Sequence, residues 1–316
     1  MDFKTMQELL DCCEQQQLSI AEVMLQRESQ ISGRSRQEII DMMKDRLITM
    51  KEAVDAGVSD ASKTSSGISG GDAVLMGRYR ENGDSLSGEL ISDAMRFAFA
   101  TSETNARMGV IVATPTAGSA GILPGCLFSL HENAGLTFEQ LVMGLFTASA
   151  IGYVIANQSF ISGAAGGCQA EVGSATAMAA AAIVELKGGS PRQAVEATAI
   201  SLKSMLGLVC DPVAGLVEVP CIKRNVIGAA IAFSAADLGL AGICSRIPCD
   251  EVIGAMYEIG KNMPRTLRET ALGGLATTPT GQQMKSRVLN ARQEYPPCHV
   301  GTGSGLIHYP SDGAAD

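Results

Sequence analysis

The chain has 316 residues, of which 46% are hydrophobic and only 18% are charged, so it can bury about three-quarters of its unfolded surface in a large core. Tryptophan is absent and aromatic residues amount to 4%, which favours packed helices over an aromatic-rich β-sandwich. The 33 acidic residues outnumber the 24 basic ones, so the chain should repel nucleic acid and anionic membrane surfaces, and neither is an expected partner.

Capping patterns predict helices at the start of the chain. Ser19 with Glu22, and Ser35 with Glu38, have the three-residue spacing of a capping box, in which each side chain bonds the backbone of the other residue. The first 55 residues are therefore expected to form an amphipathic region of short helices. From residue 58 to 71 the sequence turns to Ser, Gly and Thr. These residues are too small and polar for a core element, so a loop is expected there.

Helical patterns return further along the chain, and alternation with a period of two is rare. Strand is therefore expected only for a few residues near Gly109 and Val217. The stretch from Val226 to Ile243 is the most membrane-like, but it carries Asp237 and many small residues, so it predicts a buried helix. The later helices are expected at Ser87–Arg107, Thr137–Asn157, Ser174–Lys187, Pro191–Met205, Val226–Leu240 and Asp250–Lys261.

The sequence predicts a mostly α fold with a single helical domain over residues 1–298 and active-site loops rich in Gly, Ser and Thr. A second such loop covers residues 113–121, where Pro115 disfavours helix at Thr114. Residues 299–316 contain four glycines and no helical or strand period. They are expected to be a flexible tail or a remnant of foreign sequence.

The cysteines indicate metal chemistry. The nine Cys are scattered rather than arranged as a disulfide framework and no apolar leader opens the chain, so a cytoplasmic location is expected. Cys168 precedes an Ala-rich helix, where a helix N-terminus lowers the pKa of a thiol, and Cys210 and Cys221 lie beside Pro at element ends. Three converging thiolates without a fourth suggest an iron–sulfur cluster with one open iron, which can act as a Lewis acid. Zinc is less well supported, because no Cys-x-x-Cys or His-x-x-x-His pair exists.

Over residues 3–298 the chain resembles a known family, the catalytic alpha chain of bacterial two-subunit iron–sulfur L-serine dehydratases. The resemblance implies a 4Fe-4S cluster held by Cys168, Cys210 and Cys221, with the fourth iron free for substrate. It also implies dehydration of L-serine to aminoacrylate, which becomes pyruvate and ammonia. The motifs that carry it are Ser66-Gly67-Ile68-Ser69-Gly70-Gly71, residues 113–121, the Cys168 segment, Cys210-Asp211-Pro212 and Cys221-Ile222-Lys223-Arg224-Asn225.

The resemblance implies two further features. In the family a Cys at the end of the chain can fold back onto the open iron, and the matching residue is Cys298, which is expected to occupy that iron in the absence of substrate. This chain departs from the pattern because residues 299–316 follow Cys298. A separate beta chain is also expected, because the resemblance covers only a catalytic subunit.

The two hydroxyl-rich segments have two interpretations. Their side chains can simply satisfy backbone groups in turns, or they can bind a small zwitterion through hydroxyls and backbone N–H groups. In the second interpretation the expected catalytic residues are Ser69, Thr116 and Ser119, and Lys63 and Arg224 are candidates for the substrate carboxylate. No carboxylate or His stands out as the base that removes the α-proton, and a partner chain could supply it. The full set of expected substrate-binding residues is Lys63, Ser66, Gly70, Thr114 and Arg224.

Two other functions stay open on sequence grounds. Ser62-Lys63-Thr64 followed by Gly70-Gly71 resembles a pyridoxal-phosphate Schiff-base lysine with a phosphate loop, although the α/β pattern around such a site is missing. The chain could also be a helical iron–sulfur sensor, for which three Cys suffice. In that case the hydroxyl-rich segments would lack a purpose.

Overall fold

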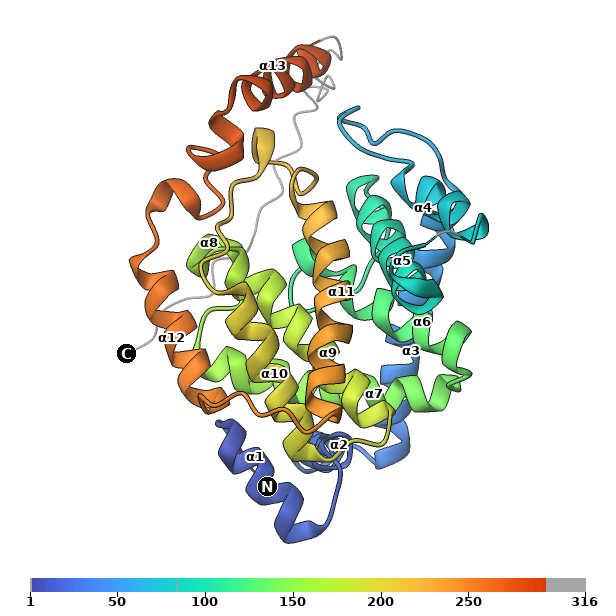
Figure 1. Ribbon diagram of the computed structural model, residues 1–316, viewed down its shortest axis with the longest axis vertical. Coiled ribbons are helices and arrows are strands. Elements are labelled where there is room, and N and C mark those ends of the chain that lie inside the picture. Colours follow the sequence, from blue (N-terminus) through green and yellow to red (C-terminus); the bar gives the residue numbers. More distant parts are fainter. Residues whose placement is uncertain (1, 84, 294–316) are drawn as a thin grey trace, which may run out of the picture.

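The computed structural model describes residues 2–83 and 85–293, and helices dominate them (Figure 1). The mostly α fold predicted from the sequence is confirmed. The helices are α1 Met6–Gln16, α2 Ile20–Ser32, α3 Arg36–Ser59, α4 Asp72–Glu81, α5 Gly88–Ala106, α6 Ile122–Ala134, α7 Phe138–Gln158, α8 Gly163–Gly166, α9 Ser174–Leu186, α10 Pro191–Met205, α11 Cys221–Leu240, α12 Cys249–Asn262 and α13 Pro279–Gln293; five shorter turns are η1 Ala117–Ser119, η2 Gln169–Gly173, η3 Val213–Gly215, η4 Arg265–Leu267 and η5 Gly274–Thr277.

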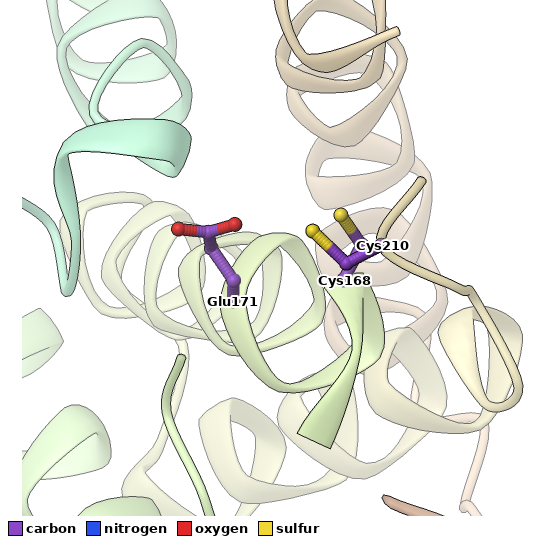
Figure 2. Close-up of side chains that lie close together, drawn as sticks. All are labelled: Cys168, Glu171 and Cys210. Atoms are coloured by element: carbon purple, nitrogen blue, oxygen red, sulfur yellow. The ribbon is translucent and has the colours of Figure 1, made fainter. Parts of the chain in front are cut away.

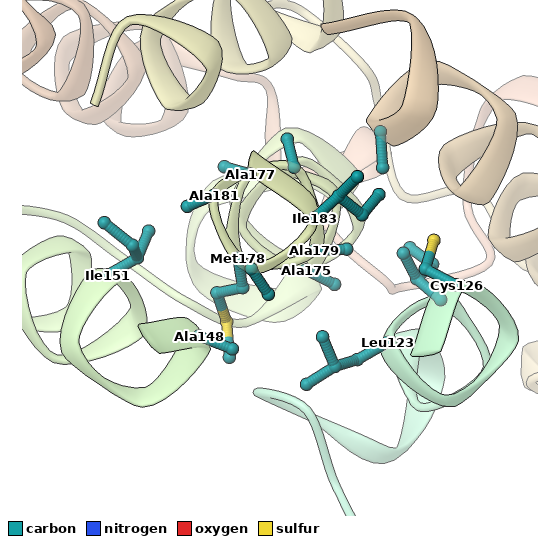
Figure 3. Close-up of a cluster of buried hydrophobic side chains, with 14 of the residues drawn as sticks. Leu123, Cys126, Ala148, Ile151, Ala175, Ala177, Met178, Ala179, Ala181 and Ile183 are labelled. Atoms are coloured by element: carbon teal, nitrogen blue, oxygen red, sulfur yellow. The ribbon is translucent and has the colours of Figure 1, made fainter. Parts of the chain in front are cut away.

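A small-residue helix forms the centre of the molecule. In α9 every residue from 174 to 184 is buried, as expected for a helix that is apolar all round. Figure 3 shows its alanines between Leu123 and Cys126 of α6 on one side and Ala148 and Ile151 of α7 on the other. Helices α10 and α11 also pack on it. Because alanine side chains are small, α6, α7, α10 and α11 can all pack closely against α9. This packing fixes the position of η2, the turn that precedes α9.

The expected strands are wrong. Gly109 lies in a turn after α5, where its amide donates to the Thr104 carbonyl at 2.9 Å, and Val217 lies in a bend. The segment around Val217 folds back on itself, because the Val213 amide donates to the Val219 carbonyl at 2.8 Å. Neither segment has a partner strand, and a strand needs one. Within the described residues the only ladder-type pairing is an isolated bridge between Cys210 and Arg268.

One described helix, α7, is long and apolar enough to cross a membrane by length and composition, and 61% of its most apolar window is buried. It packs against α2 and α9 in the core. The stretch from Val226 to Ile243 forms most of α11, which buries one face against α5 and α9 and leaves Ile227 and Leu238 exposed.

Carboxylates from distant helices cap several helix N-termini. Asp250 accepts from the first backbone amides of α1, at 2.7 Å from Met6 N, and Glu185 does the same for α2, at 2.6 Å from Ile20 N. Glu103 of α5 accepts from the Asp72 amide at 2.7 Å and so caps α4. Each carboxylate accepts hydrogen bonds from amides that have no partner within their helix, and its negative charge interacts favourably with the helix dipole. The Glu103 cap also fixes the end of the loop that precedes α4.

Candidate metal and substrate site

The three predicted cysteines lie where separate elements meet. Cys168 is the residue before η2, Cys210 follows α10 in a loop, and Cys221 is the first residue of α11. The two helices pack against η2, so the Cys-bearing ends are gathered at one place. Figure 2 shows the thiols of Cys168 and Cys210 side by side, with the carboxylate of Glu171 facing them. The two sulfur atoms and one carboxylate oxygen lie within 4.8 Å of one another.

The thiols share an electrostatic environment. A hydrogen bond from Cys210 lowers the pKa of Cys168, and the same bond raises the pKa of Cys210. Burial raises the pKa of Cys221, and the charge of Cys168 raises it further. Without a bound metal ion, the negative charge of ionised Cys168 therefore opposes ionisation of Cys210 and Cys221. A metal removes this opposition because it binds thiolates and releases their protons.

Glycines leave room around this cluster of side chains. A Cβ on Gly163 would lie 2.7 Å from the Cys210 sulfur and 3.2 Å from Glu171 Oε2, and one on Gly118 would lie 2.6 Å from Glu171 Oε1. Any side chain there would fill the space beside the thiols. Three buried Cys beside a glycine-lined space can ligate three irons of a 4Fe-4S cluster and leave the fourth iron without a Cys ligand, so the residues present fit such a group.

Glu171 was not anticipated from the sequence. It is buried, its pKa is raised by burial, and it accepts a hydrogen bond from the Thr116 hydroxyl. Its only sequence signal is its place three residues after Cys168. The bond to Thr116 joins the cysteine cluster to the second hydroxyl-rich loop.

Arg224 lies against the cysteine cluster. Its Nη1 is 3.5 Å from the Cys168 sulfur and donates to the Val209 carbonyl at 2.7 Å, while its Nη2 is 2.9 Å from Asp211 Oδ1. The guanidinium therefore fixes the segment around Cys210 relative to α11. Its expected contact with a substrate carboxylate stays a prediction.

The first turn of α11 holds both hydroxyl-rich loops. Lys223 pairs with Asp72, the residue after the first loop, at 2.9 Å. Asn225 donates to the Gly118 carbonyl at 2.7 Å and accepts from the Gly121 amide at 2.9 Å, and so holds the second loop. The motif Cys221–Asn225 was singled out from the sequence. The positioning role of Asn225 was missed, because both of its partners lie more than 100 residues away.

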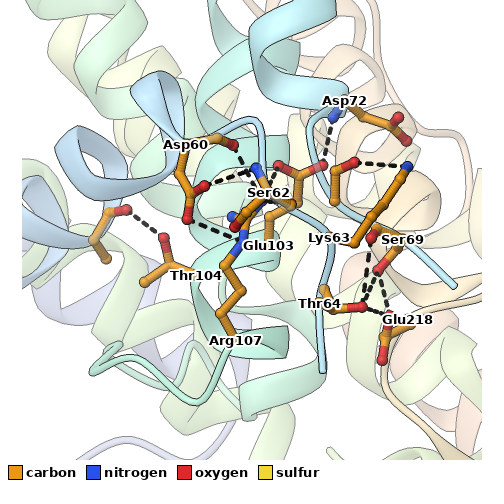
Figure 4. Close-up of polar contacts among 12 residues, drawn as sticks. Asp60, Ser62, Lys63, Thr64, Ser69, Asp72, Glu103, Thr104, Arg107 and Glu218 are labelled. Carbon is orange, nitrogen blue, oxygen red and sulfur yellow. Dashed lines mark hydrogen bonds and ion pairs between the residues drawn. The ribbon is translucent and has the colours of Figure 1, made fainter. Parts of the chain in front are cut away.

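We call residues 60–71 the first hydroxyl loop. In it the Thr64 hydroxyl donates to Glu218 Oε2 at 2.7 Å, and the Ser69 hydroxyl donates to the same oxygen (Figure 4). Lys63 Nζ donates to the Gly70 carbonyl at 3.0 Å, which closes the loop. The remaining expected residue, Ser66, is 3.0 Å from Thr64 Oγ1.

Both ends of the first hydroxyl loop are held by α5. Arg107 Nη2 donates to the Ser62 carbonyl at 2.6 Å, and its Nε is 3.2 Å from Asp60 Oδ2. Glu103, one helical turn before Arg107 and 3.6 Å from its guanidinium, caps the amide of Asp72 at the other end (Figure 4). The loop is therefore preorganised before any ligand binds, which lowers the entropy cost of binding.

We call residues 113–121 the second hydroxyl loop. Ser119 is fully buried and its hydroxyl donates to the Thr114 carbonyl at 2.9 Å. The Thr116 hydroxyl reaches Glu171, and the buried Thr114 hydroxyl has no hydrogen-bond partner within the described part of the chain. A buried hydroxyl without a partner is costly, so Thr114 marks a place where a ligand could bond.

Two expectations concern residues outside the described ones. Cys298 as the occupant of the open iron, and residues 299–316 as a tail, both lie beyond residue 293. The eight Cys of the described residues are all free thiols.

The described residues form a helical fold in which a buried thiol–carboxylate cluster, of a composition that can bind a metal ion, lies beside a loop rich in Ser and Thr. Comparison with known proteins gives the family: residues 15–276 match the model of the serine dehydratase alpha chain, and this chain belongs to that family.

Individual relatives cover nearly the whole chain. It is 55% identical over 286 residues, 90% of this chain and 95% of the relative, to the probable L-serine dehydratase alpha chain of Bacillus subtilis (strain 168). It is 42% identical over 281 residues, 89% of this chain and 96% of the relative, to the L-serine dehydratase alpha chain of Peptoniphilus asaccharolyticus. It is 37% identical over 286 residues, 87% of this chain but only 62% of the relative, to L-serine dehydratase TdcG of Escherichia coli (strain K12).

Proposed function

We propose that the chain is the catalytic subunit of an L-serine dehydratase that converts L-serine to pyruvate and ammonia through aminoacrylate, in the cytoplasm. Its 4Fe-4S cluster would be held by Cys168, Cys210 and Cys221. The observation that carries the proposal is the meeting of three buried Cys from three separate elements in a chain of the serine dehydratase alpha-chain family.

The chemistry divides between the cluster and the chain. When bound, the cluster supplies a Lewis-acidic iron, which allows hydroxide, a poor leaving group, to depart. The chain supplies the groups that bind substrate and move its α-proton. Ser69 and Thr116 each donate a hydrogen bond to a buried carboxylate, Glu218 and Glu171, and a hydroxyl beside a general base is an activated one. Ser119 donates instead to a backbone carbonyl, which cannot take a proton, so we assign proton transfer to Ser69 or Thr116.

Anaerobic purification tests the proposal. We expect a broad visible absorption shoulder that is lost in air, together with pyruvate formation from L-serine. A sharper band removed by borohydride would instead indicate pyridoxal phosphate on Lys63. A cluster without serine turnover, even with a partner chain, would indicate the iron–sulfur sensor and overturn the proposal.

We infer that a beta chain completes the enzyme. The Bacillus subtilis and Peptoniphilus asaccharolyticus relatives are named as alpha chains of L-serine dehydratase, and an alpha chain implies a separate beta chain. We expect co-expression with a beta chain to give a stable complex in size-exclusion chromatography and a serine turnover well above that of this chain alone. Full turnover by the purified single chain would contradict this.

The space beside Cys210 gives a steric test of cluster binding. In Gly163→Ala the new Cβ would lie 2.7 Å from the Cys210 sulfur, so Cys210 must shift, and we expect reduced iron content together with a lower melting temperature of the iron-free chain. Gly254→Ala is the matched control, because this helical glycine has nothing within 4 Å of its added Cβ and alanine favours helix by up to about 1 kcal/mol. Full iron content in Gly163→Ala would show that the space is not used.

A further inference from the structure

Glu218 is a buried carboxylate that lacks a cationic partner. It is 6% exposed, yet no ion pair among the described residues includes it. Two hydroxyls donate to its Oε2, and no described residue donates to its Oε1. An ionised carboxylate can accept about four hydrogen bonds, and a buried charge is costly unless it is paired. Glu218 Oε1 therefore has acceptor capacity that no described residue uses, and the charge of this carboxylate has no paired cation.

The cations of this chain that lie nearby are engaged elsewhere. Lys63 donates to the Gly70 carbonyl, Lys223 pairs with Asp72, and Arg224 pairs with Asp211. No Lys or Arg among the described residues forms an ion pair with Glu218. The missing positive charge is therefore expected from a ligand.

The hydroxyls beside Glu218 are left as acceptors. A carboxylate only accepts, so Thr64 and Ser69 must each give their single O–H to Glu218. Ser66 is then the donor in its 3.0 Å contact with Thr64. The protons of Thr64 and Ser69 are thus directed to the carboxylate, and the oxygens of both hydroxyls keep lone pairs that can accept a hydrogen bond. Such a group matches a ligand with N–H donors and a positive charge, and it does not match a carboxylate.

Glu218 is close to the expected metal centre along the chain. It lies three residues before Cys221, and three residues span at most about 10 Å. A ligand as small as an amino acid could therefore contact Glu218 and the region of the thiols at the same time.

We propose that Glu218, with the Thr64 and Ser69 hydroxyls, binds the ammonium group of the substrate, so that proton transfer falls to Thr116, whose hydroxyl donates to Glu171. This rests on the proposed function and adds to it the basis of amino-acid specificity, because a hydroxy acid without the amine leaves Glu218 buried and unpaired. The substrate carboxylate then falls to other groups, and the buried Thr114 hydroxyl, which has no hydrogen-bond partner among the described residues, is a donor available to it.

The test compares L-serine with 3-hydroxypropionate, which is serine without its amine, on the holoenzyme with its beta chain. Because the holoenzyme turns over L-serine, its binding is measured as KM, and binding of 3-hydroxypropionate is measured as its competitive inhibition constant. We expect the wild type to prefer L-serine by about 100-fold, as charged hydrogen bonds in a buried site allow. Glu218→Gln should lose most of that preference. Its affinity for L-serine should fall, while its affinity for 3-hydroxypropionate should change less than about threefold. Glu132→Gln, an exposed glutamate on α6, is the matched control and should keep the preference.

Ser69→Ala keeps the test decisive if Glu218→Gln fails to fold, since it removes one acceptor and leaves the carboxylate. Ser69→Ala should lower the affinity for L-serine about tenfold and leave the affinity for 3-hydroxypropionate unchanged. The visible absorption of the cluster should stay intact. Equal weakening of both ligands in these variants would mean that Glu218 only supports the loop, and would overturn the inference. Absence of serine turnover in the wild-type holoenzyme would overturn the proposed function instead.

Discussion

Replacing Cys168, Cys210 or Cys221 by Ala, one at a time, is expected to abolish both bound iron and serine turnover. Each Cys comes from a different element, so no neighbouring thiol can take its place. Loss of the Lewis acid removes several kcal/mol of transition-state stabilisation, which corresponds to a loss of at least about 10³-fold in kcat. Iron and sulfide per chain, visible absorption and pyruvate formation measure the outcome.

The control for these variants is Cys126→Ala, which removes a buried thiol in the helical core, where it donates to the Ala229 carbonyl at 3.7 Å. It should keep full iron content. Glu171→Gln gives a second comparison, because the Glu171 carboxylate is grouped with Cys168 and Cys210 within 4.8 Å whereas Cys221 is not. If Glu171→Gln loses iron while Cys221→Ala keeps it, the third ligand is the carboxylate and the predicted set is wrong.

Helices were predictable where local chemistry sets their ends. Helix α10 begins and ends at the predicted Pro191 and Met205, because Ser190 caps it, Pro occupies its first turn and Gly207 follows it. The box at Ser35 and Glu38 is complete. The box at Ser19 is only half formed, since Ser19 accepts from the Glu22 amide while the Glu22 side chain bonds Arg36 at 2.7 Å.

The elements missed or misjudged depend on distant contacts. Helix α4 follows a glycine-rich loop without a side-chain cap from its own N-cap residue, and its cap comes from Glu103. Helix α11 starts at Cys221, five residues before the predicted Val226. Cys221 was expected at an element end beside Pro, and the residues after it were singled out only as a motif. Their polar side chains bond to other segments.

The chemistry of the site was predictable in its residue types and not in its connections. Cys168, Cys210 and the hydroxyl loops were chosen from the sequence, but no carboxylate was assigned to them. Thr116 is 55 residues from Glu171 and Thr64 is 154 residues from Glu218, and no local spacing relates such pairs. Only the packing of α5, α9 and α11 brings them together.

The second large effect is expected at Arg224, whose removal should destabilise the iron-free chain. Arg224→Met leaves Asp211 without its cation, and Asp211 is only 3% exposed. Breaking a buried pair by removing one partner costs about 3–5 kcal/mol. Urea unfolding followed by circular dichroism measures the change. Lys223→Met is the adjacent control, because its pair with Asp72 has a 71% exposed Lys side chain and should contribute at most about 1 kcal/mol.

A second substitution separates the structural role of Arg224 from its predicted contact with the substrate carboxylate. Arg224→Met combined with Asp211→Asn removes both charges, so most of the lost stability should return, as expected for coupled neighbours. If Arg224 also binds substrate, the double variant regains stability while its KM for L-serine stays high. If the KM of the double variant returns to the wild-type value together with its stability, Arg224 only neutralises Asp211 and positions the Cys210 segment. Equal destabilisation by Arg224→Met and Lys223→Met would contradict the buried pair itself.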